Sequence, residues 1–437
     1  MASANVLPQK KVAGAFQSRD FRLYQTARLF VILGAEAQSV AVAWQVYQIT
    51  HSALSLGYTG LALFLPGLFF MLPAGHVADR YDKRHVILVC YAVQAVCTAV
   101  LLWISLHHIS SIVPIYCVLF LIGTGRCFSG PAASAMLPSL VPKDSFVNAV
   151  TWGATVYQTA NATGPMVGGL LFTATFVALG RWHGAPIVYL FTLAMMCGFL
   201  VMVGMIRVRA VAGPRKAFQA STVLAGLKYV AETKLLLGSI SLDLFAVLLG
   251  GAVALMPIFA ETILHAGPKG LGLLRAMPSL GALVVSLTLL FKPIKRRAGK
   301  TMMICVGIFG AATVLFGLSR SILVSMIALL LVGASDMVSV VIRSSILQLA
   351  TPEDMRGRVS AVNWLFIGAS NEFGEFESGL TAHWFGAVPA VVVGGVASLV
   401  VTGVSALLFP ALRRADKLTA ESLREAETEM AAAEPID

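Results

Sequence analysis

Charged side chains are scarce in this chain of 437 residues: Asp, Glu, Lys and Arg together make up 12% of it, whereas hydrophobic residues make up 57%. A soluble domain of this length carries about twice that charged fraction. Charge-poor stretches recur along nearly the whole chain, so one buried core does not explain them. The composition therefore excludes an ordinary soluble protein and indicates an integral membrane protein.

Cysteine pairs and metal-binding spacings are missing as well. The six cysteines all lie inside apolar segments and none forms a CxxC pair, so we interpret them as reduced and structural. The eight histidines are scattered, without an HExxH motif or a paired spacing. These absences argue against a disulfide framework, a metal site and a membrane enzyme, and we expect neither a cofactor nor a bound metal.

Long apolar segments, by contrast, fill the chain. A helix needs roughly 20 mostly apolar residues to cross about 30 Å of hydrocarbon, and segments of this length are far too long for barrel strands. We therefore predict an all-α polytopic membrane protein with twelve transmembrane helices and, because the start of the chain is polar and basic, no cleavable signal peptide. The predicted spans lie near residues 23–48, 53–78, 85–106, 111–137, 147–179, 184–206, 235–264, 270–291, 301–319, 322–350, 358–385 and 388–411.

Lys and Arg residues follow the even-numbered spans. The formal net charge is +11, yet only Arg181, Lys269 and Arg320 lie in loops that follow odd-numbered spans. Cytoplasmic loops of membrane proteins are enriched in Lys and Arg, so we expect both termini in the cytoplasm. The positive charge thus serves topology, and we expect a lipid bilayer and no nucleic acid as partner.

The two halves of the chain resemble each other. A shift of 210 residues (374 − 164) places Gly164 on Gly374 and Gly169 on Gly379. Two repeated halves joined by a cytoplasmic linker suit a transporter that rocks about a central site. We predict an N-terminal six-helix bundle at 1–206, a linker with a short amphipathic helix at 207–234, a C-terminal six-helix bundle at 235–411 and a polar cytoplasmic tail at 412–437.

A segment that runs from Gly75 to Arg84 directly follows the second span. Its glycine permits close helix approach, and its first aspartate, beside a basic cluster, can form a charge latch that breaks when the two halves move. The segment resembles the signature loop of the major facilitator superfamily, GxxxD(R/K)xG(R/K)(R/K), except that aspartate stands where the second glycine is usual. The residues are Gly75, Asp79, Arg80, Asp82, Lys83 and Arg84.

Two further motifs are similar to those of the same superfamily. Arg126-Cys-Phe-Ser-Gly130 in the fourth span resembles its RxxxG motif, whose arginine is linked to proton coupling; a lone arginine in mid-membrane is otherwise expensive unless it faces water or an acid. The fifth span carries a GPxxGG sequence like the end of the superfamily's antiporter motif, which is associated with export. Small-residue packing and a buried structural ion pair are the alternative interpretations. The GPxxGG residues are Gly164, Pro165, Gly168 and Gly169.

The resemblance covers essentially the whole chain and implies the superfamily's fold of two pseudo-symmetric six-helix bundles. ADRYDKR after the second span, and TPEDMRGRVSAV between the tenth and eleventh spans, look most like the drug/proton antiporter branch that contains enterobactin exporters and macrolide-efflux proteins. That branch implies a monomer in the bacterial cytoplasmic (inner) membrane that exports a small organic molecule, drug-like or a siderophore, with the proton gradient as its energy source.

Charged residues inside the spans are the candidates for coupling, because intramembrane charges usually face a cavity or a partner. Asp336 occupies the repeat position of Arg126 (336 − 126 = 210), so we expect the two to face each other across the cavity, and Asp336 and Arg343, seven residues apart, to pair loosely. Arg275 and Glu261 lie near span ends, and their side chains are expected to reach the membrane–water interface. The coupling candidates are Glu36, Arg126, Asp243, Asp336, Arg343, Glu372, Glu375 and Glu377.

The three glutamates of the eleventh span leave two interpretations open. Glu372 and Glu375 share a helix face at i and i+3, while Glu377 points elsewhere. They form either a proton or cation relay or ion pairs with cytoplasmic arginines. We hypothesise a proton antiporter that uses Glu36, Asp336 and one of these glutamates together with Arg126.

Other functions stay open for such a chain. Uptake and lipid translocation use the same architecture, and a transporter-like membrane sensor is the alternative outside transport. The identity of the substrate cannot be read from these residues, although amphipathic side chains in the first, fifth and sixth spans suit an aromatic or polyoxygenated molecule.

Overall fold

Nearly all of the described chain is helical. The computed structural model describes residues 15–142, 145–179, 184–207, 220–292, 294, 296–352 and 355–416, and no strand occurs in these ranges. Ten helical segments of these ranges are long and apolar enough to cross a membrane. Two more, of 34 and 30 residues, complete the predicted twelve, and the second of these carries the three glutamates. The structure therefore confirms the all-α membrane fold.

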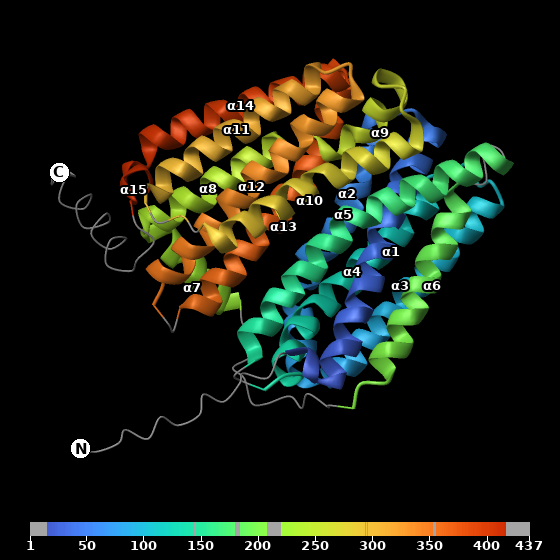
Figure 1. The fold of residues 1–437 in the computed structure, drawn as a ribbon, viewed down its shortest axis with the longest axis horizontal. Coiled ribbons are helices and arrows are strands. Elements are labelled where there is room, and N and C mark those ends of the chain that lie inside the picture. The colour runs from blue at the N-terminus through green and yellow to red at the C-terminus, as the bar shows by residue number, and fades with distance from the viewer. Residues whose placement is uncertain are drawn as a thin grey trace, which may run out of the picture.

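Six long helices form the N-terminal bundle, which runs from blue to green in Figure 1. Within it, α1 packs along α5 and α6, α2 packs along α4, and α3 packs along α4 and α6. Short 3₁₀ turns, η1 (Ala15–Gln17) and η2 (Leu137–Ser139), precede α1 and follow α4. The helices are α1 (Arg19–Thr50), α2 (Ala53–Arg80), α3 (Lys83–Leu106), α4 (Val113–Met136), α5 (Phe146–Leu179) and α6 (Gly184–Gly204).

The C-terminal bundle repeats this arrangement. α10 packs along α12 as α2 does along α4, and α11 packs along α12 and α14 as α3 does along α4 and α6. The amphipathic linker helix that the sequence predicted is α7 (Ala220–Glu232), which packs on the start of α13. The bundle consists of α8 (Lys234–Leu249), α9 (Met256–Ile258), α10 (Gly267–Phe291), α11 (Ala298–Leu318), α12 (Ile322–Ala350), α13 (Arg356–Phe385), α14 (Ala387–Leu408) and α15 (Pro410–Arg414).

The seventh span is interrupted, whereas the sequence predicted one continuous segment. α8 ends at the glycine pair Gly250-Gly251, and the chain continues through η4 (Val253–Leu255), α9 and the π-helical η5 (Phe259–Ile263). Paired glycines weaken a helix, and sharp breaks in helices occur at such positions. Irregular backbone at membrane depth is tolerated where it lines a cavity, so this break marks a place to look for a site.

The end of the described chain packs against the C-terminal bundle. Leu412 is fully buried, and the backbone carbonyl of Asp416 accepts a hydrogen bond of 3.0 Å from the Ala298 amide at the start of α11. The predicted polar tail therefore begins with residues that are part of the bundle. Its remainder, 417–437, lies outside the described residues.

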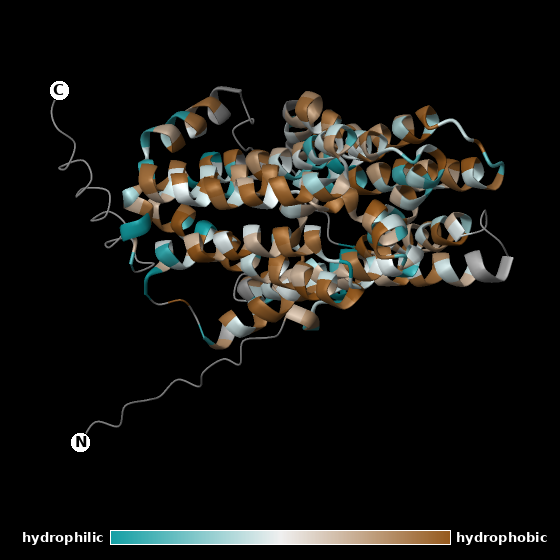
Figure 2. Cartoon of the chain, turned by 90° about the horizontal axis from the view of Figure 1, so that it is seen from above, coloured by the Kyte–Doolittle hydropathy of each residue, from teal (hydrophilic) through white to brown (hydrophobic). Residues whose placement is uncertain are grey.

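Apolar residues predominate along the helices, and hydrophilic residues are frequent at the helix ends and in the connections (Figure 2). Large hydrophobic side chains remain exposed on this surface, as at Phe291 and Leu407. A surface of this kind is stable in hydrocarbon, where exposed apolar groups carry no penalty. The exposed face of the bundles is thus suited to lipid contact.

Glycine pairs join the two bundles near one end. We call this end, which holds the α1–α2 and α3–α4 connections, the distal face; the end where residues 15 and 416 lie is the terminal face. Gly169 of α5 lies against Gly272 of α10, and Gly57 of α2 lies against Gly379 of α13, close enough that a Cβ at any of them would meet backbone atoms of the other half. The bundles diverge toward the terminal face (Figure 1).

The contacts of these glycines reproduce the sequence repeat in space. Gly164 packs on the backbone of α1, and its counterpart Gly374 packs on the backbone of α8, the first helix of the other half. Gly169 and its counterpart Gly379 both make glycine contacts between the halves. The matched residues therefore do the same packing work in each half, which supports a true duplication.

A methyl group at this interface should destabilise the protein. In Gly169→Ala the new Cβ would lie 2.7 Å from the Pro268 carbonyl oxygen and 2.9 Å from Gly272 Cα, so we expect a loss of about 1–3 kcal/mol from overpacking. Thermal unfolding of the purified protein in detergent measures this as a lower apparent Tm. Gly403→Ala is the matched control, because its Cβ would meet nothing within 4 Å; equal losses in both variants would contradict the prediction.

Candidate functional site

A cavity of about 210 Å³ lies between the two halves. α1, α2 and α4 line it from the N-terminal bundle, and α10 and α13 line it from the C-terminal bundle. Five charged side chains meet there although they are spread over more than 330 residues of sequence (375 − 36). These side chains are Glu36, Arg126, Arg275, Glu372 and Glu375.

Close helix packing sets the positions of these charges. Glu36 lies where α1 meets Gly164 of α5, and Glu375 packs directly on Gly60 of α2, so small residues make room for both glutamates. Glu36 interacts electrostatically with Arg126 and Arg275. The cavity holds three carboxyl groups and two guanidinium groups, a formal charge of −1 when all are ionised.

Arg275 is the member of this site that the sequence did not reveal. We expected its side chain at the membrane–water interface, but its Nη1 donates a hydrogen bond of 2.8 Å to Ser39 Oγ of α1, in the other half. The correction has a simple cause: α10 begins at Gly267, so Arg275 lies two turns inside the helix, and the distal part of α10 is covered by α5. Glu261 likewise contacts the other half, where its Oε1 accepts a hydrogen bond of 2.6 Å from Gln48.

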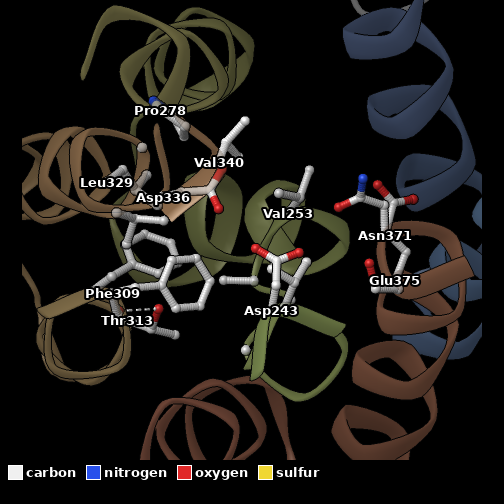
Figure 3. Close-up of a pocket in the computed structure, with 18 of the residues that line it drawn as sticks. Asp243, Val253, Pro278, Phe309, Thr313, Leu329, Asp336, Val340, Asn371 and Glu375 are labelled. Atoms are coloured by element: carbon white, nitrogen blue, oxygen red, sulfur yellow. Dashed lines mark hydrogen bonds between the residues drawn. The ribbon is translucent and has the colours of Figure 1, made fainter. Parts of the chain in front are cut away.

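A second cavity, of about 320 Å³, lies inside the C-terminal half (Figure 3). Asp243 of α8 and Asp336 of α12 direct their carboxyl groups into it, beside the aromatic ring of Phe309. The interrupted seventh span supplies part of its wall, including Gly251 and Val253. A cavity of this size, mostly apolar with a few polar groups, has the character of a ligand site.

Asp243 and Arg343 form a buried ion pair in this second cavity. The two side chains are in direct contact and both are almost fully buried. Asp336 makes no hydrogen bond and no salt bridge to a residue of the described ranges. The expected loose pair of Asp336 with Arg343 is therefore wrong, because Arg343 is engaged by an acid of α8 instead. The cavity thus holds a second acid, Asp336, beside an ion pair whose charges cancel.

The two cavities are neighbours that share a wall. Glu375 and Val253 line both of them. Arg126 and Asp336, however, line different cavities, so the expectation that they face each other across one space is wrong. The repeat places them in separate bundles, Arg126 on α4 and Asp336 on α12. The Glu375 side chain therefore lies in the wall between the two cavities.

The three glutamates of α13 lie on two different faces of the helix, as the helix period predicts. Glu372 and Glu375 both face the cavity between the halves. Glu377 does not line either cavity and accepts a hydrogen bond of 2.7 Å from Thr381 one turn later. The relay interpretation therefore concerns Glu372 and Glu375, and Glu377 serves as an internal comparison on the same helix.

The loop after α2 is stabilised by a capping interaction at the start of α3. Asp82 starts α3 as its N-cap, and its Oδ1 accepts a hydrogen bond of 2.9 Å from the Arg84 amide. The Arg84 guanidinium donates to the carbonyl groups of Val203 and Gly204 at the end of α6. An N-cap aspartate explains why this position needs no glycine.

The other residues of this loop differ in exposure. Gly75 is half-buried in α2, Arg80 is exposed in its last turn, and Lys83 is buried at the start of α3. Asp79 lies in the last turn of α2, but its side chain is outside the described part of the structure. The charge latch at Asp79 stays a prediction.

The GPxxGG residues of α5 have two packing partners. Gly164 and Gly168 lie against α1, where a Cβ at Gly168 would come within 2.7 Å of the Ala37 backbone. Gly169 and the Pro165 carbonyl lie against Gly272 of α10. The motif therefore holds one helix of the N-terminal half against its own bundle and against the other half at once.

No group of three or more His, Cys, Asp and Glu side chains with a metal-binding arrangement occurs in the described ranges. Two pseudo-symmetric six-helix bundles around a charged cavity at their interface, in a chain with an apolar surface, define a secondary transporter and not an enzyme. Comparison with known proteins agrees. The model of the family described as transmembrane secretion effector, within the major facilitator superfamily, matches residues 12–434, and the chain belongs to this family.

Curated relatives span nearly the whole chain. The enterobactin exporters EntS of Citrobacter koseri and of Escherichia coli O1:K1 are each 27% identical to it over 393 residues, covering 88% of this chain and 87% of the relative. Solved transporters share the fold at much lower identity. A POT family transporter in complex with 5-aminolevulinic acid has a TM-score of 0.70 and 13% identity, covering 90% of this chain and 97% of its own.

A bacterial homologue of the iron transporter ferroportin in an inward-facing state is similar to the same degree. Its TM-score is 0.69 at 13% identity, and the match covers 90% of this chain and 98% of that one. At such identities the likeness shows the fold alone, so the site must be argued from the residues of this chain.

Breaking the buried ion pair from one side should destabilise the C-terminal bundle. Arg343→Met leaves Asp243 buried without its partner, and we expect a loss of about 3–5 kcal/mol. The double variant Asp243→Leu, Arg343→Met should recover much of this, since it leaves no uncompensated charge. Apparent Tm in detergent is the measurement, with the exposed Arg414→Met as control. A single variant as stable as wild type would show that the pair is not formed.

Proposed function

We propose that this chain exports a small organic molecule from the cytoplasm by alternating access, in exchange for protons. The observation that carries the proposal is the charged cavity between the halves, where Glu36, Arg126, Arg275, Glu372 and Glu375 meet. Opposed bundles can expose such a cavity first to one side and then to the other.

The contacts between the halves suggest which side is open. The two glycine pairs and the hydrogen bond of 2.6 Å from Gln48 to Glu261 all lie toward the distal face. The bundles diverge toward the terminal face (Figure 1). If the lysines and arginines of the even-numbered loops place the terminal face in the cytoplasm, the bundles diverge on the cytoplasmic side, the side from which an exporter is loaded.

Charge balance supports a proton as the coupling ion. With the shared Glu375 counted in the cavity between the halves, that cavity has a formal charge of −1, and the other charged residues of the C-terminal cavity, Asp243, Asp336 and Arg343, also sum to −1. Unbalanced charge is unfavourable in a low-dielectric interior. One proton on a carboxyl group neutralises either cavity, and a substrate that competes for the same carboxyl releases it. Exchange follows from this competition.

The curated relatives suggest the class of cargo. They are named as enterobactin exporters, so a siderophore or a drug-like molecule of similar chemistry is the first candidate. Export, and not uptake, is the direction that these relatives favour.

Inside-out membrane vesicles with an acidic interior test the proposal. Enterobactin and a panel of drug-like compounds serve as cargo, and the protein should accumulate at least one of them only while the pH gradient is present. Glu36→Gln, Glu372→Gln and Glu375→Gln should each reduce gradient-driven accumulation by roughly tenfold or more, because a glutamine cannot take up or release the exchanged proton; a tenfold loss corresponds to about 1.4 kcal/mol. Glu377→Gln, on the same helix but off both cavities, is the matched control.

Three results would overturn the proposal. Accumulation that ignores the imposed pH gradient would exclude proton exchange. Full gradient-driven transport in all three glutamine variants would exclude these carboxyl groups. Transport that proceeds only out of inside-out vesicles would indicate uptake instead of export.

A further inference from the structure

The C-terminal cavity has room for a molecule, although transport as proposed above uses it only for a proton. It lies inside one bundle, between α8, α10, α11, α12 and α13, whereas the other charged cavity lies between the halves. An engineered cavity of about 150 Å³ lined by apolar residues is enough to bind benzene. The volume of about 320 Å³ found here therefore accommodates a substituted ring.

Apolar side chains form most of the wall of the C-terminal cavity. Phe309 and Phe316 of α11 line it. Leu329 and Val340 of α12 also line it (Figure 3). Burial of apolar surface favours binding, and the face of a phenylalanine ring attracts a cation within about 6 Å. The wall thus suits a ligand with an apolar body and tolerates a positive charge.

One carboxyl group in this cavity is left without a partner among the described residues. Asp336 directs its carboxyl into the cavity (Figure 3). Its side chain is half-buried and not sealed inside the protein, so a ligand in the cavity can reach it. A charge in a low-dielectric interior is unfavourable unless it is paired, and a bound cation supplies the missing partner.

The guanidinium that lines the same cavity does not cancel this charge. Arg343 is in direct contact with Asp243, and both side chains are almost fully buried. Their charges sum to zero, so Asp336 leaves this group of three with a net charge of −1. Glu375, in the wall shared with the cavity between the halves, adds a further acid at the boundary. The field in the cavity therefore favours a cation over an anion.

The same residues argue against a metal ion as the ligand. No group of three or more His, Cys, Asp and Glu side chains that could hold a metal occurs in the part of the chain that the structure describes. A bare ion would also leave the apolar wall of a cavity of about 320 Å³ without contacts. An organic cation uses both the single free acid and the wall.

We propose that the C-terminal cavity binds a compact organic ammonium ion, with its nitrogen on Asp336 and its apolar body against Phe309 and Phe316. The ammonium N–H groups donate charge-assisted hydrogen bonds to the carboxylate. This ligand is separate from the cargo proposed for the cavity between the halves. Because Glu375 lines both cavities, the bound cation lies beside a carboxyl group of the proposed transport site.

Equilibrium dialysis of radiolabelled benzylammonium against the purified full-length protein in detergent tests this site. We expect saturable binding by the wild type and at least about tenfold weaker binding by Asp336→Asn, which keeps the size of the side chain but removes its charge. Glu377→Gln is the matched control, because it removes an acid of the same bundle that lines neither cavity. Benzyl alcohol, a neutral molecule of the same shape, should not compete.

A second variant keeps the proposal testable if Asp336→Asn does not fold. Phe309→Leu keeps an apolar side chain but removes the ring, so it should weaken binding by about threefold. Phe291→Leu, at an exposed ring at the end of α10, should leave binding unchanged.

Three results would overturn this assignment. The first is the absence of saturable binding by the wild type. The second is unchanged binding in Asp336→Asn, or equal competition by benzyl alcohol, either of which would show that the charge plays no part. The third is a loss of binding in Glu36→Gln or Glu372→Gln, which would assign the cation to the cavity between the halves. None of these results depends on the direction of transport or on its coupling to protons.

Discussion

Backbone contact between glycines of opposite halves is the constraint on which the central site depends. Gly169 meets Gly272, and Gly57 meets Gly379, without any side chain between the helices. Only this close approach brings α1 and α2 to the same cavity as α10 and α13. In a bilayer, where lipid tails are as apolar as the helices, tight packing of small residues is a main source of helix association.

The arginines that line the two cavities each have an acid in the same cavity. Arg343 is held by Asp243 in the C-terminal half, while Arg126 and Arg275 share a cavity with three glutamates. With Asp336 counted in the C-terminal cavity and the shared Glu375 counted in the central one, each cavity has one acid in excess. The cost of a buried charge makes such an excess hard to explain by stability alone, and it gives both cavities the capacity to take up one positive charge.

The two halves share the packing contacts of their matched glycines but differ in the charged residues between those glycines. Gly164 and Gly374 both support the first helix of their half, and Gly169 and Gly379 both join the halves. Between the two glycines of its half, however, α13 carries Glu375 at the position where α5 has Pro165 (375 − 165 = 210). Packing at the interface constrains both halves equally, whereas the proposed coupling carboxyl is needed only once.

The sequence by itself determined the twelve spans, the repeat and the common face of Glu372 and Glu375. Apolar length is fixed by the thickness of the bilayer, and the helix period decides which residues of one helix share a face. The tertiary structure alone decided that Arg343 pairs with Asp243, that Arg275 reaches Ser39, and that the seventh span breaks beside a cavity. Those partners lie on different helices, and which helix faces meet depends on packing between segments that no local pattern encodes.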